Sequence, residues 1–210
     1  MSYTLLYYNE LMIMRFTVRL FSVASKIAFA FTIFLAPMRW RIVLEARPSP
    51  TIYKDFTDFL LFSSDISMLL LFIFWGISLI LVAKPLKFGP RFIWMPLIGI
   101  ILAGFASLYS SLDGQLTFYH VFRLIWMLVF YLYIVNEIRS PSIAIASITL
   151  QLVFQSICAI LQFFLQKSVG LKALGEHNLD PDVSGVSIVS NGLERLLRSY
   201  GLAEHPNILG

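Results

Sequence analysis

The chain has 210 residues, of which 58% are hydrophobic, 15% aromatic and only 13% charged, against about 25% charged in ordinary soluble domains. A soluble domain needs polar residues recurring along each element to face water, and long stretches of this sequence have none, so the composition indicates an integral membrane protein. The net charge of +4 comes from basic residues spread along the chain, which argues against a nucleic-acid partner.

Five stretches are candidates for membrane spans, each close to the 20 or so apolar residues that cross the hydrocarbon. The first is Leu20–Met38, where Lys26 is near enough to one end for its ammonium to reach the interface. Before it, Ser2–Met14 is apolar but short, and we interpret it as an interfacial helix or as sequence ahead of a later start. The other spans are expected at Phe59–Ala83, Phe92–Ser107, Leu116–Val135 and Ser142–Leu165.

Short polar connectors between spans favour antiparallel neighbours. The expected fold class is therefore all-α and integral to the membrane: an antiparallel bundle of about five spans with one long extracytoplasmic loop. We expect residues 1–19 to be a cytoplasmic or interfacial N-terminus, 20–165 the membrane region, 166–207 the extracytoplasmic loop, and 208–210 the start of a sixth span.

Basic residues near the span ends predict a cytoplasmic N-terminus. The connector KPLKFGPR (84–91) is short and basic with no acid, which fits the inner side. The 39–54 segment, expected outside, carries basic residues that nearby acids offset: Arg39, Arg41, Arg47 and Lys54 against Glu45, Asp55 and Asp58.

The long loop contains a predicted β-hairpin. Asn191-Gly192 lies between two runs rich in branched apolar residues, and Asn-Gly favours a two-residue type I′ turn because both positions take positive φ. We expect Val186–Ser190 to pair with Leu193–Tyr200; a short amphipathic helix over Gly192–Tyr200 is the alternative.

Two charges are expected inside the spans. Arg123 is about 10 Å from the outer end of the fourth span, at 1.5 Å per residue, and Asp65 is about as deep in the second. They could form an ion pair that only orders the bundle. Alternatively, Arg123 and His120, which share a helix face, line a cavity that takes an anionic head group.

Several kinds of chemistry are missing from the sequence. No Gly-rich loop followed by Lys and Ser or Thr is present to cradle a nucleotide, and no Ser nucleophile elbow. His120, His177 and His205 are too scattered to argue for a metal. The single cysteine, Cys158, is expected to be a small buried hydrophobe. We expect no metal, no cofactor and no reaction driven by ATP.

The last sixteen residues, RLLRSYGLAEHPNILG, form a polar approach to a new apolar run. His205 or Asn207 could cap the incoming helix, and Pro206 fixes the chain that enters it. Arg198 would lie beside that helix start, where a guanidinium and backbone N–H groups suit a phosphate. Arg195 is expected to be a solvated hairpin residue.

This stretch resembles the Arg-x-x-Gly…His-Pro-Asn element of the O-antigen ligase and polymerase superfamily, which precedes a mid-chain transmembrane helix. The residues that carry the resemblance are Arg198, Tyr200, Gly201, His205, Pro206 and Asn207. It extends back through Leu161–Glu176 and Gly185–Gly192, so it covers about the last quarter of the chain by motif and the rest by the order of hydropathy.

The resemblance implies a multi-pass glycosyltransferase of the bacterial inner membrane. Such enzymes take a glycan from an undecaprenyl diphosphate carrier on the extracytoplasmic face and join it to a glycan, lipid A core or protein acceptor. Arg198 would bind the diphosphate and stabilise its developing charge, with Arg123 and His120 as further substrate-binding candidates. Gly201, His205, Pro206 and Asn207 would belong to the motif or cap the helix.

The catalytic base of the family is a histidine in a second outer loop further along. The resemblance therefore implies that this chain is the N-terminal half of a longer protein and is inactive by itself. Two other classes stay open: a lipid or polysaccharide transport component that uses Arg123 and Asp65 along its path, and a structural bundle without a ligand. The polar candidates map to the predicted outer side, which favours the ligase or polymerase over a transporter.

Overall fold

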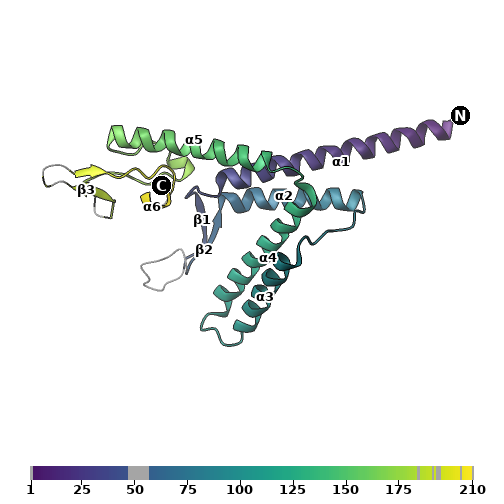
Figure 1. Ribbon diagram of the computed structural model, residues 1–210, viewed down its shortest axis with the longest axis horizontal. Coiled ribbons are helices and arrows are strands. Elements are labelled where there is room, and N and C mark those ends of the chain that lie inside the picture. The colour runs from purple at the N-terminus through teal and green to yellow at the C-terminus, as the bar shows by residue number, and fades with distance from the viewer. Residues whose placement is uncertain are drawn as a thin grey trace. The chain divides into compact units, whose positions relative to one another are not determined.

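The computed structural model describes residues 2–46, 57–183, 185–190, 192, 195–203 and 205–209. Its α-helices, shown in Figure 1, are α1 (Ser2–Leu35), α2 (Ser63–Leu81), α3 (Arg91–Ser107), α4 (Gly114–Glu137), α5 (Ser142–Leu165) and the single turn α6 (Pro206–Leu209). Its strands are β1 (Arg41–Glu45), β2 (Phe59–Phe62), β3 (Ile188–Ser190) and β4 (Arg195–Leu197). Several residues that entered the predictions above lie outside the described residues: Arg47, Lys54, Asp55, Asn191 and Leu193.

The chain divides into two compact units, and each is treated by itself. The first unit consists of residues 1–29, 44–59 and 67–141, and contains α3 and α4. The second unit consists of residues 30–43, 60–66 and 142–210, and contains α5, β3, β4 and α6.

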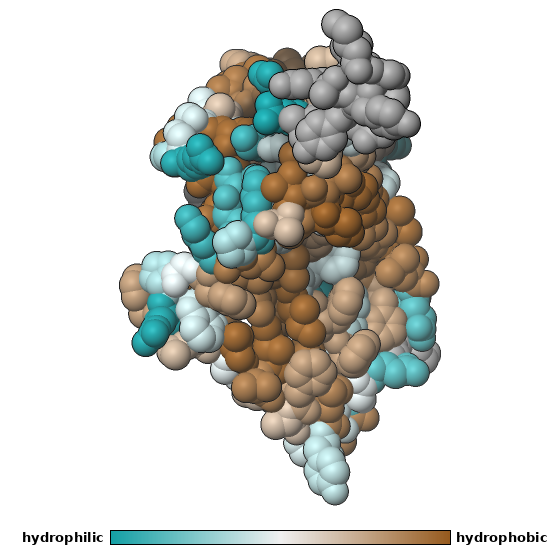
Figure 2. All heavy atoms as spheres, turned by 90° about the vertical axis from the view of Figure 1, so that its right-hand side faces the viewer, coloured by the Kyte–Doolittle hydropathy of each residue, from teal (hydrophilic) through white to brown (hydrophobic). Residues whose placement is uncertain are grey.

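Within the described residues, four helical stretches are long and apolar enough to cross a membrane: Met12–Leu35, Ser63–Leu81, Gly114–Glu137 and Ser142–Leu165. The fifth predicted span corresponds to α3, which is apolar but has 17 residues. Large apolar side chains stay exposed along the helices, and apolar atoms cover much of the face shown in Figure 2. Such exposure suits lipid rather than water. The helices therefore fit a multi-pass membrane protein, while the count of five spans and their orientation stay predictions.

The first helix differs from its prediction. Instead of a separate Ser2–Met14 segment followed by a span to Met38, α1 is one continuous helix that ends at Leu35. It ends there because Pro37 disfavours the helical conformation of the residue before it.

A two-stranded ladder of β1 and β2 was not expected in an all-α fold. β2 takes up Phe59–Phe62, so the second predicted span begins at Ser63 and not at Phe59. A run of four apolar residues fits a strand or a helix equally well, because periodicity cannot separate the two over so short a length.

The predicted hairpin of the long loop is confirmed as a pair of strands, but the predicted length of its turn is wrong. β3 and β4 are antiparallel with Ser190 opposite Arg195, so residues 191–194 intervene where a two-residue turn was expected. Because Arg195–Leu197 is a strand, the alternative helix over this stretch is also wrong.

The first unit is built on close contact between α3 and α4 (Figure 1). Asp113 caps α4, because its carboxylate accepts a hydrogen bond from the backbone N–H of Leu116 at 3.0 Å. Gly104 of α3 faces α4, and a Cβ at this position would lie 2.7 Å from Cγ2 of Val121. The absence of a side chain at Gly104 therefore allows the two helices to approach.

We predict opposite effects for two glycine substitutions in α3. Gly104→Ala should lower the Tm of the detergent-solubilised protein, because the new methyl group displaces Val121, a change that costs about 1–3 kcal/mol. Gly99→Ala is the matched control, since a Cβ there meets nothing within 4 Å, and it should leave Tm unchanged or raise it by the better helix propensity of alanine. Equal Tm values for the two variants would contradict this packing.

Candidate functional site

One face of α5 is buried and mostly polar. Its buried residues follow one another at intervals of three or four, which places them on a single helical face: Ser147, Gln151, Gln155, Cys158 and Gln162. Buried amides are costly unless they are hydrogen-bonded. Gln155 and Gln162 find hydrogen-bond partners in the segment that follows the helix.

Gln162 is fully buried, and its amide makes four hydrogen bonds. Its Oε1 accepts from the backbone N–H of Tyr200 at 2.9 Å and of Gly201 at 2.8 Å. Its Nε2 donates to the carbonyl of Gly201 at 2.8 Å and to Oε1 of Glu176 at 3.0 Å. Because an amide offers two donors and two acceptor sites, Gln162 is saturated.

Two other glutamines hold the same segment. Oε1 of Gln155 accepts from Leu202 N at 2.6 Å, and Oε1 of Gln166 accepts from Leu197 N at 2.7 Å. We call Gln155, Gln162 and Gln166 the glutamine ladder. The ladder fixes the backbone of residues 197–202, which contain the Arg-x-x-Gly element. Of these residues, only Leu197 belongs to a strand.

Glu176 organises the turn that joins α5 to this segment. Its carboxylate accepts hydrogen bonds from the backbone N–H groups of Val169 at 2.6 Å, Gly170 at 2.8 Å and Leu171 at 2.5 Å, besides the bond from Gln162. Burial by itself would raise the pKa of Glu176, but the bonds from Gln162 and the three N–H groups outweigh it and lower the pKa below its ordinary 4.5. The turn therefore depends on the ionised carboxylate.

Tyr200 lies at the centre of a group of polar side chains. Tyr200 is 98% buried, and its ring centroid lies 5.7 Å from that of His177 and 6.1 Å from that of His205. Its hydroxyl accepts from Ser187 N at 2.8 Å. The buried ring is therefore fixed at both ends, by the ladder at its backbone and by Ser187 at its hydroxyl.

Each of the two imidazoles is linked to an arginine. Arg39 bonds to His177 directly, and Arg198 is linked to His205 through Asn207. Nη1 of Arg39 lies 2.8 Å from Nδ1 of His177. Nη2 of Arg198 donates to Oδ1 of Asn207 at 2.9 Å, and Asn207 N donates to Nδ1 of His205 at 3.2 Å. We call Arg39, His177, Arg198, Tyr200, His205 and Asn207 the Tyr200 cluster. It presents guanidinium and imidazole donors that suit an anionic ligand.

The motif residues of the second unit thus come together. Arg198, His205 and Asn207 are exposed, Gly201 and Pro206 are buried, and α6 begins at Pro206. Arg195 is an exposed hairpin residue whose Nη1 lies 3.7 Å from Oδ1 of Asp182. Cys158 is buried against Met38 and Leu202.

Arg39 and His177 were missed as site residues by sequence reasoning. They are 138 positions apart, Arg39 was counted only as a loop charge, and no spacing rule connects them. The one available signal was the motif match that ends at Glu176, directly before His177.

Arg123 and His120 belong to the first unit. Nη1 of Arg123 donates to the hydroxyl of Tyr119 at 2.8 Å, with the guanidinium 5.6 Å from the centre of that ring. His120 is exposed, with its ring 5.2 Å from the Tyr119 ring. A hollow of about 570 Å³ is lined by Phe59, Tyr119, Phe122 and neighbours, and neither Arg123 nor His120 lines it.

Asp65 lies in the first turn of α2, where its carboxylate accepts from Phe62 N at 3.0 Å. Asp65 was predicted to lie several residues inside the second span. The structure places it close to the helix start instead. Since Asp65 and Arg123 belong to different units, their pairing stays a prediction.

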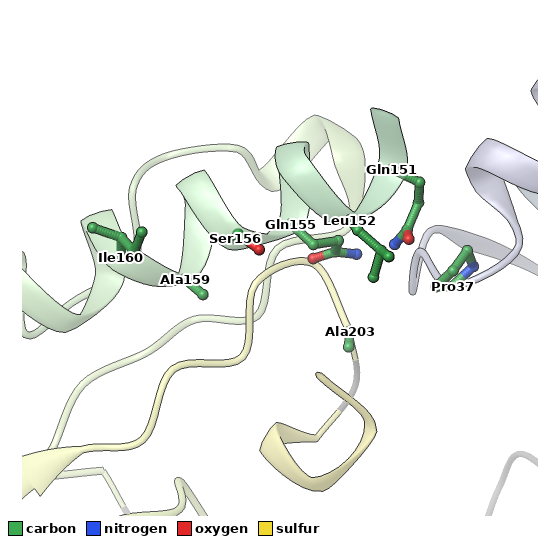
Figure 3. A pocket seen from close by; sticks show the side chains of 8 residues that line it. All are labelled: Pro37, Gln151, Leu152, Gln155, Ser156, Ala159, Ile160 and Ala203. Carbon is green, nitrogen blue, oxygen red and sulfur yellow. The ribbon is translucent and has the colours of Figure 1, made fainter. Parts of the chain in front are cut away.

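A groove of about 450 Å³ runs beside the ladder in the second unit (Figure 3). It is lined along α5 by Gln151, Leu152, Gln155, Ser156, Ala159 and Ile160, and across from the helix by Pro37 and Ala203. Its lining is mainly apolar, and Gln151 and Gln155 contribute the two amides.

No group of three His, Cys, Asp or Glu side chains that could hold a metal ion occurs among the residues described. Comparison of the chain with known protein families, curated proteins and solved structures finds no match.

We predict that Gln162→Leu releases the segment from 197 to 202. The change leaves three backbone groups of Tyr200 and Gly201 without their partner, and a buried unsatisfied group costs about 1–3 kcal/mol. Trypsin cleavage after the exposed Arg198 should become at least tenfold faster, as a loss of about 1.4 kcal/mol would already produce.

Gln151→Leu is the matched control, because Gln151 is buried on the same face and makes no hydrogen bond to residues 197–202 in the described part of the chain. Its cleavage rate should equal that of the wild type. Equal rates for all three proteins would contradict the role of Gln162.

A second prediction concerns pH. Because the pKa of Glu176 is lowered in the folded protein, its stabilising contribution is complete above the ordinary pKa and is lost as the pH falls through the lowered value. The Tm of the wild type should therefore fall by more than that of Glu176→Gln as the pH is lowered below the ordinary pKa of 4.5. Asp182→Asn, which removes an exposed carboxylate, should keep the wild-type dependence of Tm on pH. If Tm of Glu176→Gln depended on pH as that of the wild type does, the role of Glu176 would be contradicted.

Proposed function

We propose that the protein takes part in glycan transfer from an undecaprenyl diphosphate carrier to an acceptor, in an O-antigen ligase-like or polymerase-like reaction at the extracytoplasmic face of a bacterial inner membrane. The single observation that carries the proposal is the hydrogen bond from Arg198 to Asn207 at 2.9 Å, above a backbone that the glutamine ladder holds. It joins the first and last residues of the motif that carries the family resemblance.

The proposed role of Arg198 follows from the chemistry of the step. The bond between the anomeric carbon and the diphosphate oxygen breaks, while the acceptor hydroxyl oxygen forms a bond to that carbon and loses its proton. The departing diphosphate gains negative charge, which a guanidinium held in place stabilises without reorganising. Asn207 orients the guanidinium through one Nη, and the planar fork leaves further N–H donors directed elsewhere.

The surroundings support a lipid-linked donor. The four long apolar helices found among the described residues fit a protein in contact with the bilayer in which such a carrier is dissolved. A diphosphate leaving group supplies the driving force, which agrees with a sequence that has no nucleotide-binding loop.

The test is glycan transfer in vitro from an undecaprenyl diphosphate-linked donor, with the whole product of the reading frame in proteoliposomes. We expect Arg198→Ala to reduce kcat by at least about a hundredfold, the loss typical for one group that stabilises a developing oxyanion. Arg198→Lys should recover only part of it, because an ammonium lacks the planar fork.

Arg195→Ala is the control. It removes an equal charge three residues before Arg198, from an arginine that forms an exposed ion pair with Asp182. This variant should transfer glycan at the wild-type rate. Wild-type transfer by Arg198→Ala would remove the proposed role of Arg198.

A further inference from the structure

The connector between α2 and α3 is bonded to α4 although it has no regular secondary structure (Figure 1). Oδ1 of Asn136, in the last turn of α4, accepts from the backbone N–H of Lys87 at 2.9 Å. Nδ2 of the same amide donates to the carbonyl of Lys87 at 2.9 Å. The hydroxyl of Tyr131 donates to the carbonyl of Phe88 at 3.0 Å. Because Asn136 bonds both backbone groups of one residue, it fixes the direction of the connector as well as its position.

The next residue of the connector packs directly on α4. A Cβ at Gly89 would lie 2.5 Å from the Tyr131 hydroxyl and 3.2 Å from Cγ2 of Val135, and Gly89 has a φ of +76°. Only glycine fits there. The end of α2, the start of α3 and the end of α4 therefore lie on the same side of the first unit. Since α2 and α4 are long and apolar enough to cross a membrane, residues beside their ends lie at the level of the lipid head groups.

The connector carries three basic side chains and no acidic one: Lys84, Lys87 and Arg91. All three are exposed, and none of them forms an ion pair with a described residue. Lys84 and Arg91 are within four residues of Lys87, so their Cα atoms lie within about 14 Å of the contact with Asn136. Glu137, the acid that follows Asn136, is half-buried, and its carboxylate accepts from Nε1 of Trp75 at 3.3 Å. The connector is therefore a basic surface with a fixed backbone.

Exposed apolar side chains alternate with these charges. Leu86, Phe88 and Phe92 are 45%, 51% and 79% exposed, and the centroid of the Phe88 ring lies 5.7 Å from that of Trp94. Aromatic side chains concentrate at the head-group level of membranes, and basic side chains attract anionic lipids there. A soluble anion would account for the charges but not for the apolar side chains between them. The alternation therefore indicates a lipid.

We propose that the connector of residues 84–91 binds the head groups of anionic phospholipids in the surrounding bilayer, and that Asn136 is its positioning residue. Lys84, Lys87 and Arg91 supply the positive charge, and the neighbouring apolar side chains contact the acyl chains. The inference requires that the helices cross a bilayer. It depends neither on which side of the membrane the connector faces nor on glycan transfer.

The experiment measures the Kd of dioleoyl phosphatidylglycerol and of dioleoyl phosphatidylcholine for the whole protein in detergent, by native mass spectrometry. The two lipids share their acyl chains and differ in net charge. The wild type should bind phosphatidylglycerol at least about tenfold more tightly, since each basic residue near a charged membrane surface strengthens binding about fivefold. The triple variant Lys84→Gln, Lys87→Gln, Arg91→Gln should lose this preference and keep its affinity for phosphatidylcholine.

The charge-matched control is the triple variant Lys167→Gln, Lys172→Gln, Arg195→Gln. It removes three exposed basic side chains of the second unit and should keep the preference. Asn136→Leu tests positioning, because it keeps every charge and releases the backbone of Lys87. The preference of this variant should fall at least about threefold, since ordering the released connector on the lipid costs conformational entropy. Its affinity for phosphatidylcholine should stay unchanged.

A wild type without preference for phosphatidylglycerol would overturn the inference, as would a connector variant that keeps the preference of the control variant. Wild-type preference in Asn136→Leu would overturn the positioning role of Asn136. Competition by glycerol 3-phosphate at the concentration of the lipid would overturn the bilayer as the source of the ligand. If the wild type prefers phosphatidylglycerol but transfers no glycan, the proposed function fails and this inference stands.

Discussion

The second unit depends on the amide of Gln162. Its four hydrogen bonds join α5 to Glu176 on one side and to Tyr200 and Gly201 on the other. A fully buried amide in an apolar helix is costly unless all its groups are bonded. The same cost makes the arrangement specific, because any shift of residues 200 and 201 leaves donors or acceptors on both partners unsatisfied. A segment without regular secondary structure is therefore positioned as firmly as a strand in a sheet.

The candidate site follows from this constraint. Once Tyr200 is fixed, its ring packs against the rings of His177 and His205. His177 is hydrogen-bonded to Arg39, and His205 to Asn207, the partner of Arg198. Arg198 is exposed and Arg39 is half-buried, whereas Tyr200 and Gln162, which hold the segment in place, are buried. This division is typical of a preorganised anion site, in which the order is established before the ligand binds.

Much of the fold could be predicted from composition and apolar run length. The spans corresponding to α4 and α5 were predicted to within two residues at each end, because twenty or more apolar residues between polar connectors leave few alternatives. β1 and β2 were missed, since their apolar residues merge with a loop and with the start of α2. The hairpin was found through its branched residues, but Asn191-Gly192 suggested a shorter turn than the register of Ser190 and Arg195 allows.

The site was predictable only where residues are close in sequence. Arg198, His205 and Asn207 lie within ten positions and were predicted together by resemblance. Gln155 and Gln162 share a helical face seven positions apart, a spacing that the apolar character of the helix concealed. The bond from Arg39 to His177 depends on how α1 ends and on the approach of Gly175 to Trp40, which are tertiary features without a local signal.

The central claim is that glutamine amides of α5 hold the backbone of Tyr200, Gly201 and Leu202. Amide hydrogen exchange of the wild-type protein in lipid nanodiscs tests it most directly. The account predicts that these three amides exchange as slowly as those in the middle of α5, although none of them belongs to a helix or strand. Exchange at the rate of an unstructured loop would contradict it.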